Sequence, residues 1–114
     1  MTTTAQMLRA LADPTRLRIL NILSCCDICV CELQAVLGVS QPALSRHLAY
    51  LRNAGWVRDH REGMRVFYSL VRDVPRVEVV RTILRQMVPA DEEARHDLER
   101  LTDLMKSRAA IHAA

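Results

Sequence analysis

The sequence has no run of about 18 uncharged apolar residues, which is the minimum for a helix that spans a membrane. Its first ten residues, MTTTAQMLRA, also lack the basic segment followed by an apolar one that typifies a secretory signal. Neither a membrane protein nor an exported one is expected. We therefore predict a cytoplasmic protein.

The chain also lacks the side-chain sets of common enzymes. Its 3 glycines form no phosphate-binding loop. Neither a paired carboxylate site nor a Ser, His and Asp set is recognisable, and a cysteine nucleophile would need a base and an oxyanion site of its own. The sequence therefore predicts a protein that is not an enzyme.

Lysine is nearly absent, because Lys106 is the only lysine among 16 cationic side chains. The arginines are concentrated between Arg46 and Arg65, where the only acidic residues are Asp59 and Glu62. The later segment PADEEARHDLERLTD is acid-rich instead. A basic middle beside an acidic end gives weak support to a nucleic-acid surface.

With 114 residues, of which 50% are hydrophobic and 25% charged, the chain has the size and balance of one small globular domain. Such a domain buries only about two thirds of its unfolded surface, so pairing of two copies is a common source of further stability. We expect a single domain over residues 1–114 that forms a homodimer.

Two N-terminal segments have the apolar spacing of helices. The first, AQMLRALA, places Met7, Leu8 and Leu11 on one side of a short amphipathic helix. Asp13 and Pro14 then mark a helix start, with the aspartate as N-cap and the proline in the first turn. The segment that follows, TRLRILNIL, is so rich in leucine and isoleucine that we expect a central, buried helix.

A helix-turn-helix is predicted over residues 32–54. Its first helix ends at Gly38, a suitable C-cap, and Ser40 with Pro42 begins a second helix that ends at Gly55. Two helices joined by a tight turn that contains glycine form this motif. The second helix carries hydroxyl, amide, imidazole and guanidinium groups that can reach base edges and phosphates.

Residues 56–71, WVRDHREGMRVFYSLV, predict a two-stranded wing. Val66, Tyr68 and Leu70 alternate with other side chains, and Glu62-Gly63 is a turn signal between two β-rich arms. Arginines at the tip can straddle a phosphate backbone. The residues expected to contact DNA are Ser40, Gln41, Pro42, Ser45, Arg46, His47, Arg52, Arg61 and Arg65.

The C-terminal helices are expected over residues 75–110, the first opened by Pro75 and the second following Pro89. Ala94, Leu98 and Leu101 lie on one stripe of the second helix. The predicted fold is therefore mainly α with a small β-hairpin, arranged as a winged helix-turn-helix.

Four segments, LADPTRLRIL, CVCEL, VSQPALSRHLAYLRNAGWV and REGMRVFYSL, resemble successive segments of the ArsR/SmtB family of arsenic- and metal-responsive repressors, over roughly residues 5–71. The resemblance implies a homodimer whose first and last helices form the interface. It also implies a double-stranded operator with an inverted repeat, and repression that is relieved when an inducer binds. The interface residues expected on this chain are Met7, Leu8, Leu11, Val79, Ile83 and Met87.

All the cysteines of the chain lie within the segment CCDICVC. A reducing cytosol disfavours structural disulfides, whereas gathered thiols beside a helix start suit a soft ion. The segment CVCEL resembles the arsenic-sensor pattern CVCDL, which implies that Cys29 and Cys31 are two of three thiolate ligands. The usual third position holds Gln34 here, so the third sulfur has to come from Cys25 or Cys26.

Several alternatives for the thiols stay open. As(III) or Sb(III) is favoured as inducer because three sulfurs satisfy it, while Cd(II) or Pb(II) is the main rival because four thiolates are available. A thiol-redox sensor and buried structural cysteine are the other two interpretations. A second site at His96 and His112 is also open, although a solvated acidic helix face explains their surroundings more simply.

The spacing of the CVC pair carries a further expectation. Residues two apart on a regular helix point about 200° away from each other. If Cys29 and Cys31 both lay on such a helix they could not share an ion, so the inducer should favour an unwound first turn. Derepression would then follow as a shift of population away from the DNA-bound state.

Overall fold

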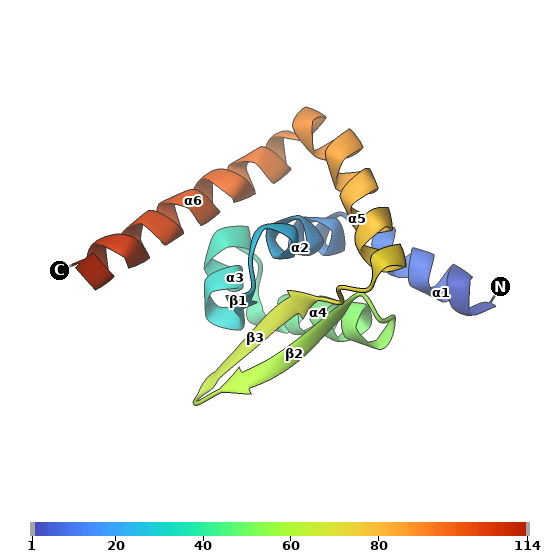
Figure 1. The fold of residues 1–114 in the computed structure, drawn as a ribbon, viewed down its shortest axis with the longest axis horizontal. Helices are drawn as coiled ribbons and strands as arrows, with labels where there is room; N and C mark the ends of the chain where they lie inside the picture. The colour runs from blue at the N-terminus through green and yellow to red at the C-terminus, as the bar shows by residue number, and fades with distance from the viewer. Residues whose placement is uncertain (1, 114) are drawn as a thin grey trace.

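The computed structural model describes the backbone of residues 2–113 and the side chains of residues 3–86 and 89–108. It is mainly helical with a small antiparallel sheet (Figure 1). In chain order the elements are α1 (Thr2–Leu11), α2 (Pro14–Cys25), β1 (Ile28–Cys29), α3 (Val30–Leu37), α4 (Gln41–Asn53), β2 (Val57–Glu62), β3 (Arg65–Leu70), α5 (Val74–Met87), the 3-10 turn η1 (Val88–Ala90) and α6 (Glu92–Ala113).

Helix α2 is the centre of the fold, as its sequence predicts. Asp13 is its N-cap and accepts a hydrogen bond at 3.0 Å from the backbone amide of Arg16, while Pro14 occupies the first turn. Five consecutive residues, from Ile19 to Leu23, are buried. A helix that is buried on nearly all sides has to be surrounded by other elements, and α2 contacts α1, α3, α4, α5 and α6.

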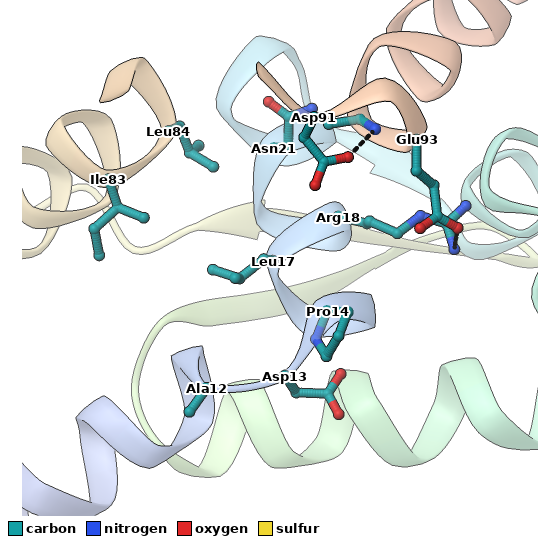
Figure 2. A pocket seen from close by; sticks show the side chains of 11 residues that line it. Ala12, Asp13, Pro14, Leu17, Arg18, Asn21, Ile83, Leu84, Asp91 and Glu93 are labelled. Atoms are coloured by element: carbon teal, nitrogen blue, oxygen red, sulfur yellow. Dashed lines mark hydrogen bonds and ion pairs between the residues drawn. The ribbon is translucent and has the colours of Figure 1, made fainter. Parts of the chain in front are cut away.

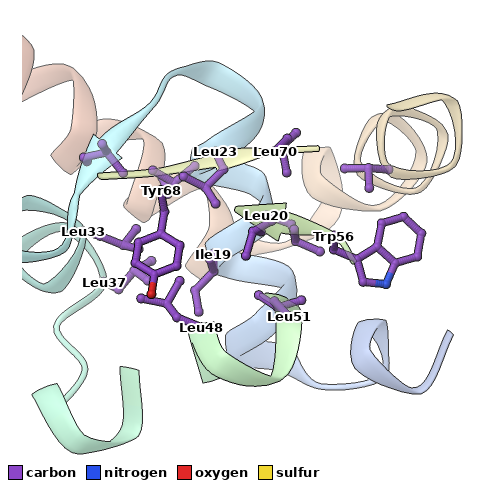
Figure 3. Packing of buried hydrophobic residues seen from close by; sticks show 14 of the residues in the cluster. Ile19, Leu20, Leu23, Leu33, Leu37, Leu48, Leu51, Trp56, Tyr68 and Leu70 are labelled. Atoms are coloured by element: carbon purple, nitrogen blue, oxygen red, sulfur yellow. The ribbon is translucent and has the colours of Figure 1, made fainter. Parts of the chain in front are cut away.

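The core gathers leucines and isoleucines of α2, α3 and α4 with residues of the sheet (Figure 3). Trp56 packs at its edge and uses its polar atom as well, because Nε1 donates to the carbonyl of Met7 at 2.8 Å. Buried tryptophan needs such a partner for its N–H group. The bond joins the start of β2 to α1.

The helix-turn-helix consists of α3 and α4. Gly38 ends α3 in the left-handed region at φ 65°, and its amide donates to the carbonyl of Gln34 at 2.9 Å. Ser40 then caps α4 by accepting from the amide of Ala43 at 3.4 Å. The motif is as expected, except that α3 begins at Val30, two residues before the predicted start at Glu32.

The sheet differs from the prediction of a two-stranded wing. It has three strands in the order β1-β3-β2, because Ile28 pairs with Tyr68 and Cys29 with Phe67. The two-residue strand β1 is stabilised by this pairing with a distant segment, and a segment so short has no alternating pattern of its own. The pairing of β2 with β3 is the expected hairpin.

Helices α5 and α6 form the C-terminal part. The second is long and crosses α2 and α3 on the side of the molecule opposite to the β2-β3 hairpin (Figure 1). Within residues 2–113, no helix combines the length and the apolar character needed to cross a membrane.

Candidate DNA interface and thiol cluster

The predicted recognition residues lie on α4 and on the hairpin, which share one side of the molecule (Figure 1). Gln41, Ser45 and Arg46 are exposed on α4, as are the capping Ser40 and the first-turn Pro42. Their side chains are therefore available to a groove of DNA. An exposed N-terminal half of a second helix is the part of this motif that reads base edges.

The hairpin is also exposed and basic. Arg61 and Arg65 are exposed near its turn, and Met64 at the tip is 97% exposed. The rings of His60 and Phe67 stack across the two strands with centroids 5.5 Å apart. This cross-strand pair stiffens the arms that carry the arginines.

Two of the predicted DNA contacts also have partners within the chain. His47 is half-buried, and its Nδ1 lies 3.3 Å from Nη1 of Arg16. Arg52 forms an ion pair with Asp59 at 3.3 Å, between α4 and β2. His47 thus ties the recognition helix to α2, and Arg52 ties it to the wing.

The four cysteines carry free thiols and occupy different environments. Cys25, at the end of α2, is exposed and donates to the carbonyl of Asn21 at 3.6 Å, while Cys26 is the half-buried C-cap of that helix. Cys29 is 2% exposed in β1, and Cys31 is exposed in the first turn of α3. The thiols thus lie in and around the short link between α2 and α3.

Cys29 and Cys31 do not lie on one regular helix. Cys29 is the N-cap of α3 and has extended dihedral angles, φ −79° and ψ 156°, so only Cys31 is helical. The helical rule of 200° between them does not apply. In the described part of the chain, no three Cys, His, Asp or Glu side chains are close enough together to hold a metal ion. A site of three thiolates is therefore not assembled among the described residues.

Cys29 has an acidic partner that sequence reasoning missed. Its thiol donates to Oε1 of Glu32 at 2.9 Å, and the other oxygen of Glu32 is paired with Arg108 of α6. Burial raises the pKa of the Cys26 thiol and the neighbouring Cys25 adds to the rise, whereas Arg108 opposes it. The thiol cluster thus lies between the end of α2, the start of α3 and the last turns of α6.

A second group of charges joins α6 to α2. Asp97 is fully buried and accepts from Arg18 at 2.8 and 2.9 Å and from Arg100 at 2.8 Å. The hydrogen bonds to Asp97 raise the pKa of the Arg18 guanidinium above its usual value, although burial acts in the opposite direction. The sequence could have indicated this buried carboxylate, because Asp97 lies on the same stripe of α6 as the buried Ala94 and Leu101.

The predicted dimer residues fall into three groups. Leu8 is 52% exposed and Val79 is 38% exposed, and both line a hollow of about 230 Å³ between α1 and α5. Leu11 is only 7% exposed and belongs to the core of one chain, and Met7 and Ile83 pack partly against that core. The side chain of Met87 lies outside the described residues, as does that of His112.

A cavity of about 390 Å³ separates α2 from α5 and the start of α6 (Figure 2). Leu17 and Ile83 line its apolar part, and Arg18 and Glu93, which are paired at 3.1 Å, line its charged part. Asn21 also lines it, and its buried Nδ2 has no hydrogen-bond partner among the described residues. None of the thiols borders this cavity.

Comparison with known proteins identifies the relatives of the chain. Residues 13–59 match the family described as bacterial regulatory protein, arsR family. The arsenic resistance transcriptional regulator ArsR1 of Pseudomonas putida is 45% identical over 86 residues, which cover 75% of this chain and 66% of that protein, slightly less than two thirds of its length. A probable mercury resistance operon repressor of Streptomyces lividans is 40% identical over 95 residues, covering 83% of this chain and 74% of that protein.

A solved structure supports the architecture. The homodimeric winged helix-turn-helix DNA-binding domain Mb0332 of Mycobacterium bovis, a possible ArsR-family regulator, is 27% identical with a TM-score of 0.68. The match covers 83% of this chain and 84% of that one. Helix order and wing are thus those of a winged helix-turn-helix, as the sequence predicts.

Proposed function

Because the chain belongs to the ArsR family of bacterial regulatory proteins, we propose that it is a cytoplasmic transcriptional repressor that binds operator DNA as a homodimer and leaves it when As(III) or Sb(III) binds its thiols. The observation that carries the proposal is the position of the thiols, with Cys29 at the N-cap of α3 and Cys31 in its first turn. This helix is the first of the DNA-binding motif. The protein is a regulator and not an enzyme.

DNA binding is supported by the exposed face of α4 together with the basic hairpin. In a dimer two such faces would meet two half-sites of an inverted repeat about one helical turn apart. Arg46 is exposed on α4 and is suited to a base edge, while Arg61 and Arg65 are suited to phosphates. Leu8 and Val79 are exposed apolar groups that a partner copy would cover.

The proposed binding of arsenite to the thiols requires no oxidant. Arsenous acid, As(OH)₃, exchanges its three hydroxyl groups for three cysteine sulfurs, and each thiol proton leaves with a hydroxide as water. We assign two of the As–S bonds to Cys29 and Cys31 and the third to Cys25, which is exposed, with Cys26 as its alternative. The relative named for arsenic resistance supports a thiophilic inducer, and the one named for mercury resistance makes Hg(II) a necessary comparison.

Binding would act on α3 directly. Cys29 is fixed in β1 opposite Phe67, and Cys31 is fixed in the first turn of α3. One ion that holds these two sulfurs and a third from Cys25 or Cys26 would draw the first turn of α3 toward β1 and the end of α2. If only the undistorted α3 presents α4 correctly to DNA, arsenite favours the free state and the population shifts away from DNA.

Single Cys→Ser variants test this proposal. Operator binding is followed by fluorescence anisotropy while arsenite, antimonite, Cd(II), Pb(II) or Hg(II) is added. We expect arsenite-driven release to vanish for Cys29→Ser and Cys31→Ser and for one variant of the vicinal pair, with DNA affinity kept. Ala35→Ser, an exposed change on α3, is the matched control.

Three results would contradict the assignment. Normal arsenite release from Cys29→Ser or Cys31→Ser would remove the proposed ligand pair. Release by Cd(II) or Pb(II) but not by arsenite would identify a divalent-metal sensor that uses the same cysteines. Release by peroxide alone, with loss of free thiols, would identify a redox sensor.

A further inference from the structure

Helix α6 contacts both ends of α3. Arg108 on α6 pairs with Glu32 near the start of α3, and Arg100, two turns earlier on α6, donates from Nε to the carbonyl of Val36 at 2.7 Å near its end. The two helices therefore run in opposite directions along each other. Helix α3, which carries Cys31, is thus held at two points by α6, a helix that carries none of the predicted DNA-binding residues.

The thiol end of this contact is a chain of three groups from three elements. Cys29 of β1 donates to one carboxylate oxygen of Glu32, and Arg108 of α6 pairs with the other oxygen. The Glu32 side chain is largely buried. Because each oxygen has its own partner, Glu32 cannot move without changing both contacts.

At its other end, the contact between α6 and α3 involves the last residues of α3, just before the turn that leads to α4. The last carbonyls of a helix lack partners within the helix and need donors from elsewhere. Here Arg100 supplies one for Val36, and Arg18 donates to the carbonyl of Leu37 at 2.6 Å. Both arginines are held in place by the buried carboxylate of Asp97 on α6.

We propose that Glu32 and Arg108 are positioning residues of the sensor, through which a thiophilic ion on Cys29 loosens α6 and, with it, the clamp on the C-terminal end of α3. This inference rests on the proposed function. An S–As bond replaces the S–H bond of Cys29, so the thiol no longer donates to Glu32. Cys29 is buried and Cys31 is exposed, so an ion bound to both would change the surroundings of the Cys29 sulfur. Glu32, without its thiol donor, would then be free to move together with Arg108.

Two features make α6 suitable as this second path to the DNA-binding motif. Its side chains contact both the thiol cluster and the last turn of α3 before α4. It contacts the thiol end through one ion pair, whereas at the other end the hydrogen bond from Arg100 to Val36 is supported by the bonds of Arg100 and Arg18 to Asp97. The contact of α6 with the thiol cluster is thus its weaker contact with α3, and a change at Cys29 can break it.

The test uses the full-length dimer and begins with the unmodified protein. Amide hydrogen exchange of residues 100–108 is measured with and without arsenite, in the absence of DNA. We expect arsenite to speed exchange in this stretch of α6. Unchanged exchange in a protein whose ultraviolet As–S absorption shows that arsenite is bound would overturn the inference.

Variants then separate positioning from structure. In Arg108→Gln and Glu32→Gln we expect the arsenite absorption to be kept and the DNA affinity without arsenite to fall toward that of the arsenite-bound protein, because the ion pair is already absent. The ratio of DNA dissociation constants with and without arsenite, of the order of 5–150 for coupled sites, should fall about tenfold. Arg108→Lys should restore most of the ratio, and Arg95→Gln, an exposed arginine on the same helix, should leave it unchanged.

The outcomes distinguish this inference from the function on which it rests. A normal ratio in Arg108→Gln would make the ion pair a merely structural contact and overturn the inference, while the proposed function would stand. Failure of the unmodified protein to bind arsenite, or to leave DNA when it is bound, would overturn the proposed function and the inference with it. Thermal unfolding of each variant confirms that it is folded.

Discussion

Arg18 of α2 donates to both carboxylate oxygens of Asp97 of α6, at 2.8 and 2.9 Å, although the two residues are 79 positions apart. Asp97 is fully buried, and Arg18 is largely so. A buried charge is tolerated when it is paired and its remaining lone pairs are satisfied, and Arg100 completes the set around Asp97.

The first prediction concerns this pair. Asp97→Ala should lower the free energy of unfolding by about 3–5 kcal/mol, because it leaves the guanidinium of Arg18 buried without its carboxylate. Urea unfolding followed by circular dichroism measures the change. Asp103→Ala, at an exposed position of the same helix, should cost far less. Equal losses in the two variants would show that the buried pair contributes little.

The second prediction concerns the dimer. Leu8→Glu and Val79→Glu place a charge on each wall of the hollow between α1 and α5, which we expect a partner copy to cover. Light scattering should then give the mass of a monomer with an unchanged helix content, since neither residue is in the core. Met64→Glu, a change at the exposed tip of the wing, should remain dimeric. A monomeric unmodified protein at micromolar concentration would contradict the interface.

The third prediction concerns base recognition. Arg46→Ala should weaken operator binding by about 1–3 kcal/mol if its guanidinium contacts a base edge, and should do so less on random duplex. Binding of the unmodified protein should also fall steeply as salt rises, because phosphate contacts release counterions. Arg95→Ala on α6 removes the same charge far from the recognition helix and should have little effect. Equal affinity of the unmodified protein for an inverted repeat and for random duplex would contradict the repressor assignment.

The fourth prediction follows from the ion pair between Arg52 and Asp59. An exposed pair of this kind contributes only about 0.2–1 kcal/mol to stability. Asp59→Asn should therefore leave the fold intact while it frees Arg52 and removes an acidic group beside the basic face. We expect DNA affinity to rise by a similar energy, about 0.5–1 kcal/mol. Weaker binding would show that Asp59 is needed to orient Arg52 rather than to hold it back.

Local signals predicted most of the fold. The cap at Asp13, the left-handed glycine at Gly38 and the cap at Ser40 act within a few residues, so the sequence displays them and the structure confirms them. Strand β1 could not be found in this way, because Ile28 and Cys29 become a strand only through Tyr68 and Phe67. Pairing between distant segments leaves no periodic pattern in two residues.

For the candidate site, too, the residues that a local motif marks could be predicted, and the contacts between distant segments could not. Exposed side chains such as Arg46 could be assigned from the motif, because one face of a recognition helix is fixed by its apolar stripe. The ion pairs of Arg52 with Asp59 and of Glu32 with Arg108 could not be predicted, since they depend on how the wing and α6 pack against other elements. The strand position of Cys29 could not be predicted for the related reason that its extended conformation goes with pairing to the distant Phe67.

The pairing of β1 with β3 also limits how the thiol segment can vary in length. Successive side chains of a strand point to opposite faces, so an insertion or deletion in the short link from Cys26 to Ile28 that shifted the pairing of β1 with β3 by one residue would exchange the two faces of β1. Both residues of β1 are buried, so after such a shift neither Ile28 nor the thiol of Cys29 would keep its present neighbours. A designer who wished to transfer this cysteine set to another winged helix would therefore have to transfer the strand and its partner residues on the wing together with it.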